Sequence, residues 1–240
     1  MTMNVLAIDT ATDHFSVALA AGHNTWLFEA DAGLRHSELI MDSIDMLFKT
    51  AALKPEELNG VVCMGGPGSF TGLRIGYSTA KGLALSLGIP FAPIPTLDCL
   101  ARPFSSLPGI FVPVLDAKRK AFFCALYREG NRLCPDMDEG PVEIVRTIAA
   151  ELSPQAGNAP EQALLFGPGA ELLYDRIAQL QLNDLAIASI KLGKLRWGNA
   201  ATMLEMAREK DIFANSNEYN FAGPEYIRKS DAEEEARDKR

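Results

Sequence analysis

The stretch that decides the fold is Met64-Gly65-Gly66-Pro67-Gly68-Ser69-Phe70-Thr71-Gly72-Leu73-Arg74-Ile75-Gly76. The apolar residues 60–64 predict a buried strand, and no proline follows Thr71 until Pro90. The glycines therefore mark a turn from a strand into a long helix, which we expect to stop at Gly88.

Two interpretations of this turn stay open. The start of a helix carries free backbone N–H groups, so the turn could hold an anion, with Ser69 and Thr71 as cap or hydroxyl ligands. Glycines are first of all conformational devices, and that argument favours a tight turn with close packing. A nucleotide P-loop is excluded, because Leu73-Arg74 stands where Lys followed by Ser or Thr would be needed.

Four segments together resemble the TsaB family, also called YeaZ. This family is the bacterial paralogue of the TsaD/Kae1 proteins, which complete threonylcarbamoyladenosine (t6A) on tRNA. The glycine run is long enough to be specific, whereas the other segments would be weak signals alone. The second half of the chain resembles the family mainly in length and in its ending at 224–228. The four segments are residues 5–10, 35–39, 65–76 and 114–120.

The element pattern predicts an α/β fold of two lobes with duplicated βββαβα order, as in actin and the sugar kinases (the ASKHA fold). Lobe one would span 1–103 and lobe two 104–228, with the last helix packing back on the first lobe, and 229–240 would be a charged, disordered tail. Expected strands are 4–10, 14–20, 25–30, 60–64, 110–116, 121–127 and 163–166; expected helices are 34–52, 71–87, 170–181 and 196–210.

Composition limits the classes of function. The 240 residues are 48% hydrophobic, with no stretch long enough for a membrane span and no signal peptide at the start, so we expect a cytoplasmic protein. Four cysteines without a C-x-x-C pair predict reduced thiols and no zinc site. A net charge of −8 disfavours tight binding of nucleic acid, so tRNA would be reached only indirectly, through a partner.

Asp9 and Asp116 end the first strands of the two expected lobes, where the actin-like fold places its phosphate-binding turns. Ala11 stands where that fold uses a glycine, and three cations follow Asp116 at 118–120. With Ser69 and Thr71, these two carboxylates would form at most a vestigial nucleotide or anion site. We expect no catalytic residue.

The metal site of the catalytic paralogue needs two histidines four residues apart on one helix. Here His36 is followed four residues later by Ile40. We therefore expect no metal, which also argues against the peptidase (M22) label that related proteins have carried. No H-E-x-x-H motif is present in the sequence.

The helices expected at 34–52 and 71–87 carry apolar residues around more of their circumference than one core face needs. Either the second helix is central in its own lobe, or the surplus marks an interface. The family resemblance implies pairing through these helices. Gly72 and Gly76 would let another backbone approach, and the expected contact residues are Leu39, Ser43, Met46, Leu73, Tyr77 and Ala80.

The resemblance implies a non-catalytic scaffold that pairs with a TsaD-like catalytic subunit and supports a TsaE-like ATPase in threonylcarbamoyl transfer to the adenosine beside the anticodon. It implies a homodimer when the chain is alone and no cofactor, and leaves a nucleotide at the subunit contact open. The alternative is a small-molecule kinase or ATPase of the actin-like fold, with Asp9, Asp116 and Ser69 as its polar site. A metallopeptidase is a third reading.

Overall fold

The computed structural model describes residues 3–152, 161–180, 189–193, 198–209, 212–214, 216–219, 223–225 and 227. The chain divides into two compact units, one of residues 1–99 with 197–240 and the other of 100–196. The boundary drawn from the sequence at 103 falls just after helix α3 (Thr96–Ala101), and α7 (Ala200–Ala207) belongs to the first unit. The tail at 229–240 lies outside the described residues.

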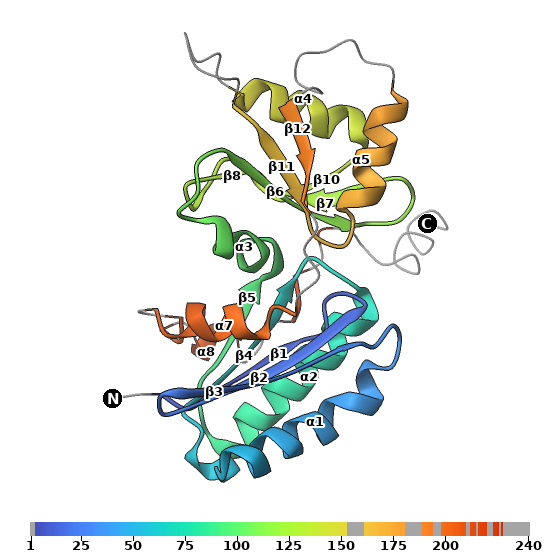
Figure 1. Ribbon diagram of the computed structural model, residues 1–240. Coiled ribbons are helices and arrows are strands. Elements are labelled where there is room, and N and C mark those ends of the chain that lie inside the picture. Colours follow the sequence, from blue (N-terminus) through green and yellow to red (C-terminus); the bar gives the residue numbers. More distant parts are fainter. Residues whose placement is uncertain are drawn as a thin grey trace. The chain divides into compact units, whose positions relative to one another are not determined.

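The first unit is built on a five-stranded sheet in the order β3-β2-β1-β4-β5. The first three strands are antiparallel neighbours, whereas β1, β4 and β5 run parallel. The strands are β1 (Val5–Asp9), β2 (His14–Ala21), β3 (Asn24–Asp31), β4 (Gly60–Gly66) and β5 (Phe91–Pro95). Helices α1 (His36–Ala51) and α2 (Phe70–Leu87) cover one face of this sheet and α7 covers the other (Figure 1).

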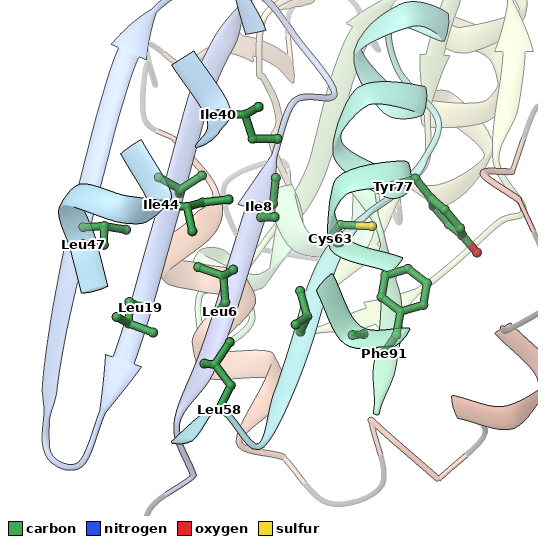
Figure 2. Packing of buried hydrophobic residues seen from close by; sticks show 14 of the residues in the cluster. Leu6, Ile8, Leu19, Ile40, Ile44, Leu47, Leu58, Cys63, Tyr77 and Phe91 are labelled. Carbon is green, nitrogen blue, oxygen red and sulfur yellow. The ribbon is translucent and has the colours of Figure 1, made fainter. Parts of the chain in front are cut away.

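Alternation along β2 explains how both faces are covered. Successive side chains of a strand point to opposite faces. Phe15, Val17 and Leu19 therefore enter the core under α1 and α2, where Ile40, Ile44 and Leu47 of α1 meet Leu6, Ile8 and Leu19 (Figure 2). The intervening positions are small, and they form the second core with α7. Small residues on that face let α7 lie close to the sheet.

The second unit repeats the same plan with the sheet order β10-β7-β6-β11-β12. Strands β6, β11 and β12 are parallel, and β7 and β10 extend the sheet in antiparallel fashion. The bounds are β6 (Ile110–Asp116), β7 (Phe122–Cys124), β10 (Met137–Glu139), α4 (Pro141–Glu151), β11 (Ala163–Phe166), α5 (Ala170–Gln179) and β12 (Ile190–Leu192). With the two short strands at 127–128 and 131–132 left out, each unit reads β-β-β-α-β-α-β in the chain, and the predicted duplicated α/β fold is confirmed.

Some elements differ from the sequence expectation. The strand expected at 121–127 is split into β7 and β8 (Tyr127–Arg128), which pair with two separate parts of β6; β8 also pairs with β9 (Asn131–Arg132). Helix α4 was not predicted. Short elements outside the two sheets are the 3-10 turns Pro55–Glu57 and Arg102–Phe104 and helix α8 (Ser216–Tyr219).

Candidate functional site

The glycine turn between β4 and α2 is filled by the chain's own β1–β2 turn. A Cβ added at Gly68 would lie 2.6 Å from the carbonyl oxygen of Ala11, and one added at Gly72 would lie 2.0 Å from that of Thr10. The Thr10 hydroxyl donates to the Gly72 carbonyl at 2.7 Å, and the Ser69 N–H donates to the Ala11 carbonyl at 2.7 Å. Close packing of two backbones therefore accounts for these glycines.

Ser69 acts as the N-cap of α2, because its hydroxyl accepts a hydrogen bond from the Gly72 N–H at 3.3 Å. Its side chain is exposed, as is that of Thr71. Gly88 ends the helix in the left-handed conformation, with φ 67°, as the sequence predicted. An anion site at Ser69 and Thr71 stays a prediction.

Asp9 at the end of β1 is fully buried and already committed to hydrogen bonds. One carboxylate oxygen accepts from the Ala11 N–H at 2.9 Å, and the other accepts from the Asn199 side chain at 2.8 Å and its backbone N–H at 3.4 Å. Burial raises the pKa of this carboxyl above its ordinary value, although these hydrogen bonds oppose the shift. Asn199 is the N-cap residue of α7.

Two further side chains of the same meander hold the start of α7. The Ser16 hydroxyl accepts from the Ala200 N–H at 3.1 Å, and the Glu29 carboxylate accepts from the Gly198 N–H at 3.1 Å. Acceptors and negative charge at a helix N-terminus satisfy its free N–H groups and interact favourably with its dipole. Sequence reasoning missed Ser16, Glu29 and Asn199, since no local spacing connects residues so distant in the chain.

Asp116 is the counterpart of Asp9 at the end of β6 in the second unit. It accepts hydrogen bonds from the Lys118 N–H at 2.8 Å and from the Lys118 ammonium at 3.0 Å. Partial burial disfavours its ionised form, but these bonds prevail and lower the pKa of the carboxyl. The candidate residues thus divide between the units: Asp9, Ser69 and Thr71 lie in the first and Asp116 in the second.

The second unit also repeats the glycine turn. Gly167-Pro168-Gly169 comes directly after β11, and Gly66-Pro67-Gly68 begins with the last residue of β4. A Cβ at Gly169 would lie 2.7 Å from the backbone N of Asp116, so this turn also packs against the end of the unit's first strand. The same device therefore serves both repeats.

His36 begins α1 and is buried, with its ring 5.9 Å from that of Phe15. Burial lowers the pKa of its imidazole, against the opposing charge of Asp9. Among the described residues its Nδ1 has no hydrogen-bond partner. Within the same part of the chain, no group of three or more His, Cys, Asp or Glu side chains could hold a metal ion.

The structure places most of the expected interface residues inside the first unit. Leu73, Tyr77 and Ala80 are at most 3% exposed, and Ser43 is buried too. Figure 2 shows Tyr77 beside Phe91 of β5, with ring centroids 5.0 Å apart. These residues present no surface to a partner, because they are buried within the first unit. Gly72 and Gly76 likewise admit Thr10 of the same chain.

Apolar surface remains on the outer side of the helix pair. Leu39 is half-buried and Met46 is 42% exposed, and Met41 and Leu85 are 53% and 59% exposed. An open groove of about 430 Å³ lies at the carboxyl-terminal halves of α1 and α2. The sequence predicted exposed apolar surface on these two helices, and the structure has it. Most of the residues that form this surface differ from the predicted contact residues.

The repeated mixed sheet, with an aspartate ending each first strand, defines a protein of the actin-like class. Two solved structures from Pseudomonas aeruginosa share the fold. An uncharacterized protein with similarity to the peptidase YEAZ has a TM-score of 0.68 at 19% identity, covering 94% of this chain and 100% of that one. YeaZ has a TM-score of 0.64 at 18% identity, covering 85% and 92%.

Sequence comparison makes the assignment narrower. The family model for tRNA N6-adenosine threonylcarbamoyltransferase (TsaD) matches residues 30–236. The TsaB protein of Bacillus subtilis is 35% identical over 55% of this chain and 58% of its own length, and that of Escherichia coli is 37% identical over 42% and 43%. An uncharacterized Mycobacterium tuberculosis protein is 32% identical over 68% and 75%. The chain belongs to the TsaB/YeaZ family.

The matched region spans only about half the length of the first two curated relatives, 58% and 53%. Both TsaB relatives are named tRNA threonylcarbamoyladenosine biosynthesis proteins. None of the helices in the described ranges has both the length and the hydropathy that crossing a membrane requires.

Proposed function

We propose that this chain is a non-catalytic subunit of the cytoplasmic machinery that forms t6A on tRNA. It pairs with a TsaD-like catalytic subunit and supports a TsaE-like ATPase, and it reaches tRNA through these partners. It works without a resident metal or cofactor. Membership of the TsaB/YeaZ family supports the pathway, because the named relatives in two bacteria are t6A biosynthesis proteins.

The proposal that the chain is non-catalytic rests on Asp9, whose carboxylate is buried and hydrogen-bonded within the protein. An actin-like enzyme needs the carboxylate at the end of its first strand to be accessible to a phosphate or to its metal ion. Here both oxygens accept hydrogen bonds within the protein, and the residue has no exposed surface. A ligand on Asp9 would have to replace the hydrogen bonds that its carboxylate accepts from Ala11 and from Asn199 at the N-terminus of α7.

Pairing would use the outer side of the helix pair, with Leu39 and Met46 as the remaining contacts from the original set. Apolar side chains grouped on an exposed helix surface usually mark an interface. A Met46→Glu substitution should therefore weaken binding to the TsaD-like protein without unfolding the chain, because the side chain is 42% exposed. Leu107→Glu is the matched control, since Leu107 is 46% exposed and lies in the second unit.

Reconstitution tests the whole proposal. The chain is added to purified TsaD-like and TsaE-like proteins with tRNA, and t6A is quantified after digestion to nucleosides. The product should depend on this chain and fall with Met46→Glu. Calorimetry of the isolated chain with ATP and magnesium distinguishes the scaffold from the alternative function, a small-molecule kinase or ATPase. Tight binding with turnover would establish a kinase or ATPase and end the scaffold proposal, and Asp116→Asn would then be expected to abolish that turnover.

A further inference from the structure

The chain that follows α7 returns to the sheet of the first unit and packs on both of its faces. Ile212 and Phe213 pack against the apolar cluster that the sheet forms with α7. Tyr219 packs against this cluster and also against the one beneath α1 and α2. Helix α8, which ends at Tyr219, packs against β5, the edge strand of the sheet. The described residues of 212–219 therefore pass around that edge.

Phe213 anchors this returning segment at the beginning of β4. Gly60 is the first residue of that strand and is buried. A Cβ added to Gly60 would lie 2.5 Å from Cζ of Phe213 and 3.0 Å from both of its Cε atoms. No side chain tolerates such a distance, so the edge of the ring lies directly on the backbone of Gly60. A glycine inside a strand commonly marks such a close approach.

Glu225 anchors the segment at the other end of β4, where the glycine turn begins. The register of β4 against β5 shifts between Met64 and Gly66, so Gly65 has no partner residue in β5. Its carbonyl instead accepts a hydrogen bond from the Glu225 N–H at 2.7 Å. The Glu225 carbonyl oxygen lies against Gly66, whose φ of 115° also excludes a side chain. Both contacts use backbone atoms of Glu225.

The segment also reaches α2, which follows the glycine turn directly. Tyr219 packs against the cluster that contains Tyr77 of α2. Burial raises the pKa of Tyr77 to about 12, and the neighbouring Cys63 and Tyr219 add to the shift. Among the described residues the buried Tyr77 hydroxyl has no hydrogen-bond partner. The segment thus contacts the turn before α2 through Glu225 and lies close to the second turn of the helix through Tyr219.

We propose that the described residues of 212–225 form a releasable strap that fixes the start of α2 on the sheet, and that release of the strap weakens pairing through the helix pair. Phe213 and Tyr219 are only half-buried, and segments with few buried contacts open at a lower free energy than the whole protein. Water that reaches the Tyr77 hydroxyl on release offsets part of the cost. The effect on pairing rests on the proposed function, whereas the effect on α2 does not.

Hydrogen exchange of the full chain, followed by mass spectrometry, tests the strap without any partner. Glu225→Pro removes the N–H that binds the Gly65 carbonyl, whereas Glu225→Ala keeps it and is the matched control. Glu225→Pro should speed exchange in residues 70–76 about tenfold, the factor expected for one lost hydrogen bond. Phe213→Ala releases the far anchor and should speed exchange in the same residues. Glu225→Ala should leave it unchanged, and exchange in α5 of the second unit should not change in any variant.

Calorimetric titration with the TsaD-like protein then tests the effect on pairing. Glu225→Pro and Phe213→Ala should each weaken binding several-fold, and Glu225→Ala should bind as the unmodified chain does. Unchanged exchange in 70–76 in both Glu225→Pro and Phe213→Ala would overturn the strap. Faster exchange there with unchanged affinity would overturn its control of pairing. If the unmodified chain does not bind the TsaD-like protein, the proposed function and the control of pairing both fail, and the exchange experiment still decides whether the strap holds α2.

Discussion

Replacement of Gly72 by alanine tests whether the glycine turn exists for close packing. The added Cβ would lie 2.0 Å from the carbonyl oxygen of Thr10, where 3.4–4 Å is ordinary contact. The neighbour is backbone at the end of a central strand, so α2 and the β1–β2 turn would have to separate by more than about 1 Å in a close-packed interior. That movement would also stretch the bond from the Thr10 hydroxyl to the Gly72 carbonyl.

The expected cost follows from these contacts. Overpacking typically costs about 1–3 kcal/mol and the lost hydrogen bond about 1 kcal/mol, while alanine gains about 1 kcal/mol over glycine within a helix. Because the clash is with backbone, we take the upper end of the overpacking range, and Gly72→Ala should lower the free energy of unfolding by about 3 kcal/mol. Gly82→Ala on the same helix meets nothing within 4 Å, so it should raise that energy by up to about 1 kcal/mol.

Urea denaturation followed by circular dichroism measures both variants against the unmodified chain. The propensity gain is common to the two positions, so the difference between them isolates the clash. A gap of about 3–4 kcal/mol is expected. If Gly72→Ala lies within 0.5 kcal/mol of Gly82→Ala, the contact with Thr10 does not constrain α2 and the packing explanation of the turn is wrong.

Three further changes test other parts of the structure by the same denaturation assay. The raised pKa of Asp9 means that the folded state binds its proton more tightly, so stability should decline as pH rises from the ordinary value of 3.8 to the raised one, and Asp9→Asn should remove that slope; an unchanged slope would contradict the assignment. The lowered pKa of His36 has the opposite sign: stability should be lost as pH falls from its ordinary value of 6.5 towards the lowered folded value, and His36→Phe should flatten that region. Arg128 donates to both carboxylate oxygens of Glu161 at 3.0 Å and to the Glu151 carbonyl at the end of α4, so Arg128→Met should cost the second unit about 1–3 kcal/mol, whereas removing the exposed Arg146 should cost less than 0.5 kcal/mol; equal effects would refute the distinction.

The sequence was most informative where a local rule acts. The strand expected at 14–20 and the glycine stop at Gly88 lie close to the observed bounds, because both depend on a few adjacent residues. The duplicated order could be read from the restart of the pattern near Ile110. The split of the strand expected at 121–127 could not be read, since it depends on where the pairing of this segment with β6 is interrupted.

The candidate site was harder to predict for a related reason. Counting apolar residues around α2 correctly showed that the helix has more apolar surface than one core face needs. The count does not say which residues are buried in the first unit, and Leu73, Tyr77 and Ala80 are buried there. The role of Asp9 required knowledge of its partner Asn199, which is 190 residues away. The sequence correctly placed the Asp9 carboxylate at the end of a strand. It could not show that Asn199 donates a hydrogen bond to that carboxylate.

That distance has a consequence for how the protein is made. The first unit needs α7 to cover one face of its sheet, yet α7 is translated only after the whole second unit. Until residues 198–207 leave the ribosome, the face of β1 and β2 that carries small residues stays exposed to water. Asp9 also lacks its hydrogen-bond partner Asn199. The second unit is encoded by one continuous stretch, residues 100–196, so it can fold before α7 has been translated. During biosynthesis the second unit should therefore finish folding before the first.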